Sequence, residues 1–285
     1  MRILVTGSEG LLGRHVMRAL LEMGHEAIGL DRTRPASNEH PFIAVDLTDA
    51  AAVEAAMPPC DTVVHLAARP SLDAGGEWIV WTENVLSLTS CLLRAEALGI
   101  PRIVFASSQS ALGLPTAPSL IPPDYLPVDE DHPCRPADGY SLSKLVGEQF
   151  CAMLGRRSRV AIVALRFPVI WDPERHAHFV KRRMDAAEQG PKSLWAYADT
   201  RDAARATCLA ATRDLSGFTI VNITSASPFA TDPTPVLVEK WFPSVASRGP
   251  IAADTPLFDN RRAISVLGFR ARFRWTPSGI VEMKD

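Results

Sequence analysis

Tyr140 and Lys144 are the residues of this chain best suited to move a proton. They lie four residues apart in the segment Tyr140-Ser141-Leu142-Ser143-Lys144, so a helix would place both side chains on one face. A phenol with a pKa of about 10 is a poor base at neutral pH, and a nearby ammonium group stabilises the phenolate. The pair is therefore a candidate acid/base group of tunable pKa, with Lys144 as the tuning charge.

A glycine-rich turn lies at the start of the same chain, in the segment Thr6-Gly7-Ser8-Glu9-Gly10-Leu11-Leu12-Gly13. It follows the apolar run Arg2–Thr6 and precedes apolar residues at helical spacing over Leu11–Met23, which is the context that dinucleotide-binding turns require. Missing Cβ atoms let a backbone approach a pyrophosphate, and the helix N-terminus supplies N–H donors. Glycine in such a turn can also serve packing alone. The residues predicted to contact a dinucleotide here are Gly7, Gly10, Leu11, Leu12 and Gly13.

Acidic residues end the next two predicted strands. Asp31 ends the strand Ala27–Leu30, 18 residues after Gly13, where a carboxylate binds the adenosine ribose and repels a 2′-phosphate. This position favours NAD over NADP, although the neighbouring Arg32 is of the type that accommodates such a phosphate. Asp46 follows the third predicted strand and is a candidate for contact with the adenine, or else a capping or turn residue.

Strand-like and helix-like segments alternate through the first half of the chain, which predicts an α/β fold with a Rossmann-type, doubly wound parallel sheet. The predicted strands are Arg2–Thr6, Ala27–Leu30, Phe42–Val45, Thr62–Leu66, Arg102–Ala106 and Val160–Leu165. The predicted helices are Leu11–Met23, Ala50–Ala56, Glu83–Leu98 and Gly139–Leu154. Serines 107, 108 and 110 follow the fifth strand and offer a hydroxyl as the third catalytic group.

The alternation weakens after Arg166. Residues 1–166 are predicted to form an NAD-binding Rossmann domain, and residues 167–285 mostly a small substrate-binding lobe, with the helix Asp199–Ala211 returning to the main sheet. The segments assigned to the lobe are Trp171–Pro191 and Leu215–Pro256. The proline-rich stretch Leu114–Pro136 has no clear period, and a loop of that length in a compact domain is usually functional.

Composition excludes several classes of protein. The 285 residues, 47% hydrophobic and 22% charged, are typical of a globular enzyme with one large domain or a domain plus a lobe. A formal net charge of -2 without a basic stripe argues against nucleic acid as a partner, and no apolar run is long enough to span a bilayer. Five scattered cysteines without Cys-x-x-Cys spacing predict reduced thiols in a cytoplasmic protein with no structural metal. The first residues run straight into the glycine turn, so they are interpreted as a strand and not a signal peptide.

Together these motifs resemble the extended short-chain dehydrogenase/reductase family, in its NAD-dependent epimerase/dehydratase branch. They follow the family order over nearly the whole chain: Thr6–Gly13, Asp31, Asp46-Leu47, His65-Leu66-Ala67-Ala68, Asn84, Ser107-Ser108, Tyr140–Lys144, Leu165-Arg166-Phe167, Tyr197–Asp202 and Ala263–Phe269. The resemblance implies NAD as the cofactor, with NADP less favoured. The further cofactor contacts that it implies are Leu47, Leu66, Ala67, Ala68, Asn84, Phe167 and, at the nicotinamide end, Tyr140 and Lys144.

The resemblance also assigns catalytic roles and an assembly. Ser108 is implied as the catalytic serine, which polarises the reacting oxygen beside Tyr140 and Lys144. Family members commonly dimerise through a four-helix bundle, which here would use the helices around Glu83–Leu98 and Gly139–Leu154.

Departures from the family pattern bear on the reaction. Gln109 and Ser110 stand where family dehydratases carry an Asp-Glu pair and where epimerase-reductases carry a cysteine, so dehydration is disfavoured. Trp195 and Val169 occupy the places of an arginine and an asparagine that hold the sugar nucleotide in epimerases. Arg248 is a candidate anion clamp, or else a solvated loop residue. These differences favour a substrate smaller than a nucleotide sugar.

The segment Phe105–Gly113 resembles that of uronate dehydrogenases, which act on free sugar acids and have Ser-Asn-His where this chain has Ser108-Gln109-Ser110. Lys192 lies near the place of a carboxylate-binding arginine in that branch, although a lysine is a weaker bidentate partner. The predicted substrate-binding residues are Gln109, Ser110, Lys192, Trp195 and Arg248. His176 and His178 are interpreted as surface residues, with acid–base roles left open.

Three functions remain consistent with these residues. The first is reversible hydride transfer at a secondary alcohol or hemiacetal carbon, as in a sugar or sugar-acid dehydrogenase. The second is a nucleotide-sugar epimerase that keeps its NAD tightly bound. The third is a non-catalytic protein that senses NAD, which the presence of Ser108, Tyr140 and Lys144 disfavours.

Overall fold

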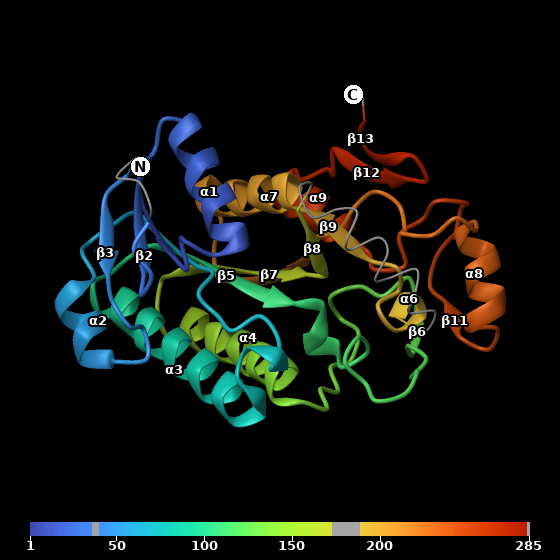
Figure 1. The fold of residues 1–285 in the computed structure, drawn as a ribbon, viewed down its shortest axis with the longest axis horizontal. Coiled ribbons are helices and arrows are strands. Elements are labelled where there is room, and N and C mark those ends of the chain that lie inside the picture. The colour runs from blue at the N-terminus through green and yellow to red at the C-terminus, as the bar shows by residue number, and fades with distance from the viewer. Residues whose placement is uncertain (36–39, 173–188, 284–285) are drawn as a thin grey trace.

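The computed structural model describes residues 1–35, 40–172 and 189–283. At its centre is a seven-stranded sheet in which all neighbouring strands are parallel, in the order β10-β7-β5-β4-β1-β2-β3 (Figure 1). These strands are β1 (Arg2–Thr6), β2 (Glu26–Asp31), β3 (Phe42–Ala44), β4 (Thr62–His65), β5 (Arg102–Ser108), β7 (Ala161–Phe167) and β10 (Phe218–Asn222). The strand order reverses between β1 and β4, and ligands of such sheets bind at the carboxyl ends beside that reversal.

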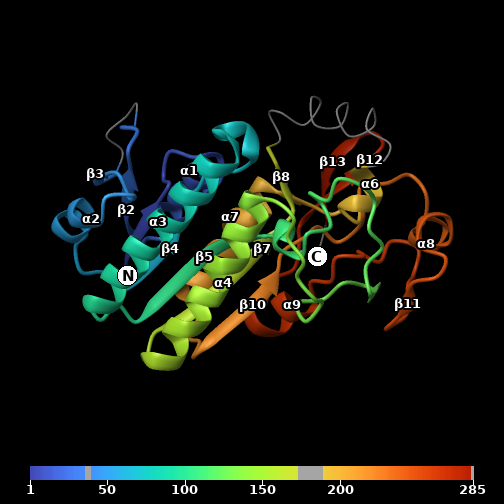
Figure 2. The same ribbon diagram turned by 90° about the horizontal axis from the view of Figure 1, so that it is seen from below.

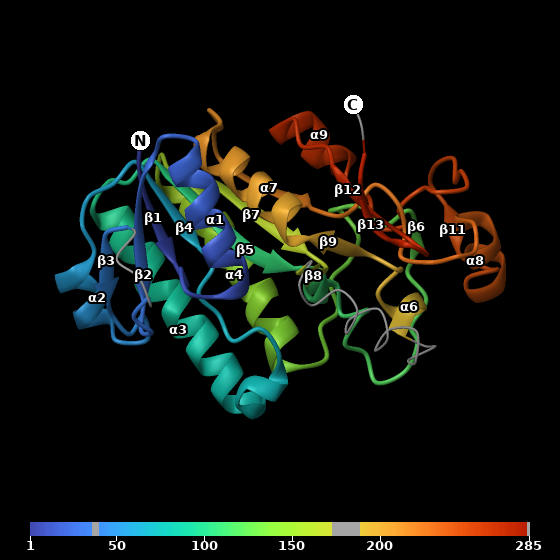
Figure 3. The same cartoon turned by 45° about the horizontal axis from the view of Figure 1, so that its top comes forward.

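Helices cover both faces of the sheet (Figures 1 and 3). One face carries α1 (Leu11–Glu22), α7 (Thr200–Thr212) and α9 (Arg261–Leu267). The other carries α2 (Ala50–Ala56), α3 (Gly76–Ala97) and α4 (Gly139–Arg157), and Figure 2 shows α3 and α4 side by side across it. Within the described ranges, no helix combines the length and the apolar composition needed to cross a membrane.

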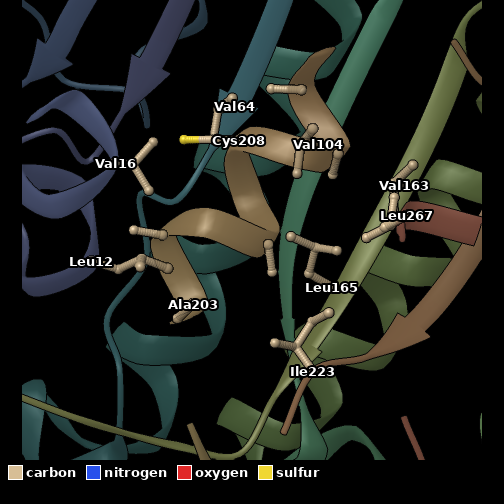
Figure 4. Close-up of a cluster of buried hydrophobic side chains, with 14 of the residues drawn as sticks. Leu12, Val16, Val64, Val104, Val163, Leu165, Ala203, Cys208, Ile223 and Leu267 are labelled. Atoms are coloured by element: carbon tan, nitrogen blue, oxygen red, sulfur yellow. The ribbon is translucent and has the colours of Figure 1, made fainter. Parts of the chain in front are cut away.

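Side chains from both faces of the strands form two buried layers. Every residue of β4 and β7 is buried, as expected for strands of a parallel sheet covered on both sides. Figure 4 shows the layer in which α7 packs against α1 and the strands. Its members include Leu12, Val16, Val64, Val104, Val163, Leu165, Ala203, Cys208, Ile223 and Leu267. The opposite layer lies between the sheet and α2, α3 and α4.

Aspartate caps fix where three helices begin. Asp49 begins α2, Asp138 begins α4 and Asp199 begins α7, and each carboxylate accepts hydrogen bonds from backbone N–H groups of the first turn. The Asp138 carboxylate also accepts from the hydroxyl of Ser141 at 2.7 Å. Such caps each contribute about 1 kcal/mol. The cap at Asp138 therefore holds Tyr140, which lies in the first turn of α4.

A small lobe lies beyond the carboxyl ends of the strands, on the right of Figure 1. Its elements are β6 (Tyr125–Leu126), α6 (Gln189–Lys192), α8 (Thr234–Trp241) and β11 (Ala246–Ser247). They enclose a hydrophobic cluster of their own, which includes Leu126, Trp195, Leu237, Phe242 and Phe258. Two further strand pairs flank it, namely β8 (Val169–Trp171) with β9 (Tyr197–Asp199), and β12 (Phe273–Thr276) with β13 (Gly279–Glu282).

The predicted α/β fold with a doubly wound parallel sheet is confirmed, and the six predicted strands match observed strands to within two residues at each end. Two assignments were wrong. The helix expected at Glu83–Leu98 begins at Gly76. The sequence pattern missed its first turns because Trp78 and Ile79 are exposed there, so the apolar residues do not mark a buried face. The segment Leu215–Pro256 was assigned to the lobe, but it contains β10, a half-buried edge strand of the main sheet. The division into domains at residue 166 stays a prediction.

Candidate active site

Two adjoining pockets lie where the strand order reverses, and both are lined by Gly7, Gly10, Leu66 and Ala68. The first, here called the acidic pocket, is also lined by Asp31, Arg32, Asp46, Leu47, Ala67 and Asn84, among others. The second, here called the tyrosine pocket, has a volume of about 560 Å³ and is also lined by Leu11, Leu12, Gly13, Ser108, Tyr140, Lys144 and Phe167, among others. Every residue predicted to contact the cofactor thus lines one of these two pockets.

The glycine turn between β1 and α1 can form only where Cβ atoms are absent. A Cβ on Gly7, whose φ is +67°, would lie 2.7 Å from the backbone nitrogen of Ala67. A Cβ on Gly13 would lie 2.0 Å from the carbonyl oxygen of Gly7. Gly10 begins α1 without a side-chain cap, so the N-terminus of this helix faces the pockets with its N–H groups uncovered. This arrangement fits the pyrophosphate of a dinucleotide.

Replacing Gly13 with Ala should displace the glycine turn, because the new methyl group and the Gly7 carbonyl cannot occupy the same space. We expect the free energy of unfolding to fall by about 1–3 kcal/mol. We expect NADH to bind roughly tenfold more weakly or worse, since the N–H donors would lose their alignment. Urea denaturation and a fluorescence titration with NADH measure the two effects.

Gly249→Ala is the control for this substitution. No atom lies within 4 Å of a Cβ built at Gly249, so stability and NADH binding should both stay near those of the parent protein. If Gly13→Ala left both quantities unchanged, the assignment of the turn to the pyrophosphate would be wrong.

Two carboxylates line the acidic pocket at the carboxyl ends of β2 and β3. Asp31 accepts hydrogen bonds from the backbone N–H groups of Glu9 at 3.1 Å and Thr33 at 3.0 Å. Asp46 accepts from the backbone and the hydroxyl of Thr48, and these two bonds hold the pKa of Asp46 below its ordinary value. Both carboxylates are therefore held in place beside the glycine turn, and Asp31 stands where a ribose hydroxyl would be bound.

Tyr140, Lys144 and Ser108 line the tyrosine pocket together. Lys144 is buried beneath Tyr140, with its ammonium 5.7 Å from the centre of the phenol ring and donating to the carbonyl of Ala106 at 2.9 Å. The hydroxyl of Ser108 accepts from the N–H of Ser110 at 3.1 Å and also hydrogen-bonds Tyr140. The hydroxyl groups of Ser108 and Tyr140 therefore lie side by side at the pocket wall, with the Lys144 ammonium near the phenol ring.

Burial perturbs the titration of this set. It raises the pKa of Tyr140, and the hydrogen bond with Ser108 opposes that rise. Burial lowers the pKa of Lys144 to about 8, although the nearby carboxylate of Glu148 acts in the opposite direction. A lysine with this pKa is close to its titration midpoint near neutral pH, so its charge is sensitive to a ligand or a neighbouring anion.

A buried ion pair beneath the tyrosine pocket was missed by the sequence analysis. Glu148 lies one helical turn after Lys144 and is 1% exposed, and its carboxylate accepts from the Arg166 guanidinium at 2.8 and 2.7 Å. The hydroxyl of Ser107 donates to the same carboxylate at 2.6 Å. The spacing from Tyr140 through Lys144 to Glu148 was the available signal, since all three share one helix face. This network ties α4 to the ends of β5 and β7.

Asn84 and the segment after β4 form the wall between the two pockets. The Asn84 side-chain oxygen accepts from the N–H of Arg69 at 2.7 Å, and its amide donates to the Arg69 carbonyl and the Ser143 hydroxyl, each at 3.2 Å. The amide is thus committed within the protein. Asn84 therefore fixes the 66–69 segment against α4, besides lining the acidic pocket.

Comparison with known proteins places this chain in a family. Residues 3–224 match the model of the NAD dependent epimerase/dehydratase family. The chain belongs to this family. It is accordingly an enzyme of the NAD-dependent short-chain dehydrogenase/reductase type, as the motifs predicted, and NAD is the cofactor of the family.

Curated relatives fall into two functional groups. The chain is 32% identical over 195 residues to a putative UDP-glucose 4-epimerase of Methanocaldococcus jannaschii, covering 64% of this chain and 62% of that protein. It is 36% identical over 155 residues to a uronate dehydrogenase of Agrobacterium fabrum, covering 53% of this chain and 55% of that protein. The chain thus spans less than two thirds of the length of either relative.

Two solved structures share the fold over nearly the whole chain. A short-chain dehydrogenase/reductase superfamily protein of Agrobacterium tumefaciens, with bound NAD, superposes with a TM-score of 0.73 at 24% identity, covering 97% of this chain and 93% of that one. A UDP-galactose 4-epimerase superposes with a TM-score of 0.69 at 26% identity, covering 95% and 93%.

Only two of the five predicted substrate-binding residues line a common pocket in the described structure. Gln109 and Ser110 line the tyrosine pocket, and the Gln109 amide donates to the Ser193 carbonyl at 2.9 Å. The other three line neither pocket. Lys192 is buried and donates to the Pro118 carbonyl at 3.2 Å, Trp195 packs against Phe242 in the small lobe, and Arg248 lies on the ring of Tyr125. His176 and His178 fall outside the described residues.

Proposed function

We propose that this protein is an NAD-dependent dehydrogenase of a free sugar or sugar acid. The observation that carries the proposal is the single pocket lined by Ser108, Tyr140 and Lys144 together with the glycine turn. Bound NAD would supply a hydride acceptor for a carbon atom held beside these residues. The 36% identity with a uronate dehydrogenase supports the choice of substrate class.

The proton of the substrate hydroxyl is the part of the reaction that the chain's own residues move. Ser108 would donate a hydrogen bond to the reacting oxygen and orient it towards Tyr140. The Tyr140 phenolate would take the proton as the carbonyl forms, and the Lys144 ammonium would stabilise that phenolate. In the reverse direction Tyr140 would return the proton.

A small substrate is favoured by the charges around the tyrosine pocket. Among the described residues that line it, Lys144 is the only cation. A nucleotide sugar carries a diphosphate, which proteins usually bind with arginines. Arg248 and Lys192, the candidates for this role, contact other groups in the small lobe.

A nucleotide-sugar epimerase is the second candidate, favoured by the 32% identity with a putative UDP-glucose 4-epimerase. It would use the same three residues and keep the cofactor bound. The keto intermediate would turn in the pocket before the hydride returned to its other face.

A substrate panel separates the two functions. Purified protein is given NAD with free uronates and aldoses, and separately with UDP- and GDP-sugars, and the release of NADH is followed by absorbance. NADH from a free sugar or sugar acid supports the dehydrogenase. An inverted stereocentre in a nucleotide sugar, without net NADH, supports the epimerase and contradicts the dehydrogenase.

Lys144 should give the dehydrogenase an alkaline limit. As the pH rises through about 8, the buried ammonium loses its proton and the Tyr140 phenolate loses its stabilising charge. The logarithm of kcat/KM should therefore fall above a midpoint near pH 8. Lys144→Arg, whose side chain stays charged, should move this limb upward by at least about one pH unit. If the alkaline fall in kcat/KM had the same midpoint in Lys144→Arg, a group other than Lys144 would be responsible for it.

We also propose that the protein is a cytoplasmic homodimer assembled through a four-helix bundle of α3 and α4. These helices pack against each other and expose Leu86, Leu93 and Leu142 by 44%, 43% and 41%. Light scattering in solution tests the assembly, because a mass of one chain would contradict it.

A further inference from the structure

The acidic pocket contains a charge arrangement that the family motifs do not account for. Five charged side chains line it: Asp31, Arg32, Asp46, Arg69 and Glu83. The lining that the structure describes therefore carries three carboxylates and two guanidinium groups. Glu83 comes from α3, whereas Asp31 ends β2 and Arg32 follows it.

Glu83 is held in place by Arg69. The two nitrogens of the Arg69 guanidinium that face Glu83 donate to its two carboxylate oxygens at 2.8 and 2.9 Å. Arg69 is itself anchored, since its third nitrogen donates to the carbonyl of Ala74 and its backbone N–H donates to Asn84. This bidentate pair keeps the pKa of Glu83 below its ordinary value. The carboxylate of Glu83 is therefore a fixed negative charge on the pocket wall.

Arg32 is the only other cation among the described lining residues. Its guanidinium lies 3.5 Å from a carboxylate oxygen of Glu83, and its side chain is 55% exposed. An arginine directly after the acidic residue of β2 is well placed to accept a 2′-phosphate on the adenosine ribose. In this structure the guanidinium instead faces Glu83. Arg69 is hydrogen-bonded to the same carboxylate, so Glu83 attracts both cations of the pocket lining.

We propose that Glu83 is a second determinant of cofactor choice, which acts with Asp31 by engaging Arg32 and so excluding a 2′-phosphate from the acidic pocket. The inference rests on the proposed function in one respect, namely that this pocket holds the adenosine end of the cofactor. It assigns the preference for NAD to two carboxylates of the pocket lining, Asp31 from β2 and Glu83 from α3. Because the Arg32 side chain is exposed and screened by solvent, we expect the dissociation constant for NADPH to change several-fold and not by orders of magnitude.

Glu83→Gln tests the proposal through binding alone. Fluorescence titrations with NADH and with NADPH, at low ionic strength, give the ratio of the two dissociation constants. The substitution removes one negative charge and releases Arg32, so NADPH should bind roughly three- to tenfold more tightly. NADH, which has no 2′-phosphate, should change by less than about twofold. The gain for NADPH should shrink in high salt.

Glu96→Gln is the matched control. Glu96 also lies on α3 and also pairs bidentately with an arginine, Arg157, but it lines neither pocket. It should leave both dissociation constants unchanged. In an Arg32→Gln background, Glu83→Gln should bring little further gain for NADPH. A full gain in that background would overturn the role assigned to Arg32.

Other outcomes overturn the inference differently. An unchanged ratio in Glu83→Gln would show that Glu83 does not discriminate. An equal loss for both nucleotides would show that it only positions the pocket wall. If the parent protein bound neither NADH nor NADPH, the proposed function would fail, and the inference with it, whereas tight NADH binding with an unchanged ratio would sink the inference alone.

Discussion

Replacing Tyr140 with Phe should lower NADH formation by roughly 10²–10⁴-fold, the usual worth of a positioned acid/base group. The substitution removes one hydroxyl and keeps the ring that lies above Lys144. The serines that line the tyrosine pocket are far weaker acids than a phenol, and Lys144, whose pKa burial lowers to about 8, is mostly protonated at neutral pH, so neither replaces Tyr140 efficiently as the proton acceptor. Initial rates with the best substrate of the panel measure the effect, and an NADH titration should show binding within about twofold of the parent protein.

Tyr125→Phe is the control for the loss of a phenol. The Tyr125 hydroxyl donates to Asp129 at 2.6 Å and lines neither pocket, so this variant should retain the parent rate. If Tyr140→Phe kept its rate, Tyr140 would not be the acid/base group. If the parent protein bound NADH but turned over no substrate, and Tyr140→Phe kept all its properties, a protein that senses NAD would be the better interpretation.

The sheet and the cofactor side of the site were predictable because they depend on local patterns. Strands buried on both faces are continuous apolar runs, as in Ile3–Val5 and Ala161–Leu165, and each run ends at the same edge of a parallel sheet. The glycine turn follows from sterics that are local in sequence, since Gly13 must clear the carbonyl of Gly7. The family match then confirmed what the motifs implied about the class of enzyme.

The small lobe was not predictable in the same way, because its side chains are placed by tertiary packing. Trp195 has a left-handed backbone with φ of 51° and turns its indole into the lobe core against Phe242. Lys192 and Arg248 likewise find partners in segments far away in the sequence, at Pro118 and Tyr125. No periodicity specifies such contacts. Alignment by position therefore does not reveal which groups these three side chains contact, and their role in substrate binding stays a prediction.

The ion pair of Glu148 and Arg166 is a second tertiary contact that the sequence pattern did not predict. Its two members lie 18 residues apart on α4 and β7, and Arg166 was known only as part of a family motif. Whether a charged residue in a helix is solvated or buried depends on which strand lies beneath it. The sequence analysis singled out the serines at and just beyond the end of β5, but the connection of Ser107 to this buried carboxylate follows only from the three-dimensional structure.

Glu148→Gln should be the most destabilising single substitution proposed for this protein. The side chains of Glu148 and Arg166 are 1% and 3% exposed, so the substitution leaves the Arg166 guanidinium buried without the carboxylate that it contacts directly. Breaking such a pair by removing one partner costs about 3–5 kcal/mol of the free energy of unfolding. Urea denaturation followed by circular dichroism measures it. Glu96→Gln, which breaks a pair whose arginine is 47% exposed, should cost at most about 1 kcal/mol.

The double variant Glu148→Met with Arg166→Met separates the effect of an uncompensated buried charge on stability from the effect of the lost hydrogen bonds. Because both ions leave the interior, neither remains uncompensated, and the cost should be smaller than that of Glu148→Gln. The Ser107 hydroxyl then loses its acceptor, which limits the recovery by roughly 1–3 kcal/mol. A double variant less stable than Glu148→Gln would mean that the network acts mainly through the hydrogen bonds that join α4, β5 and β7. A double variant more stable than Glu148→Gln would mean that Glu148→Gln loses stability because the charge of Arg166 stays buried without its partner.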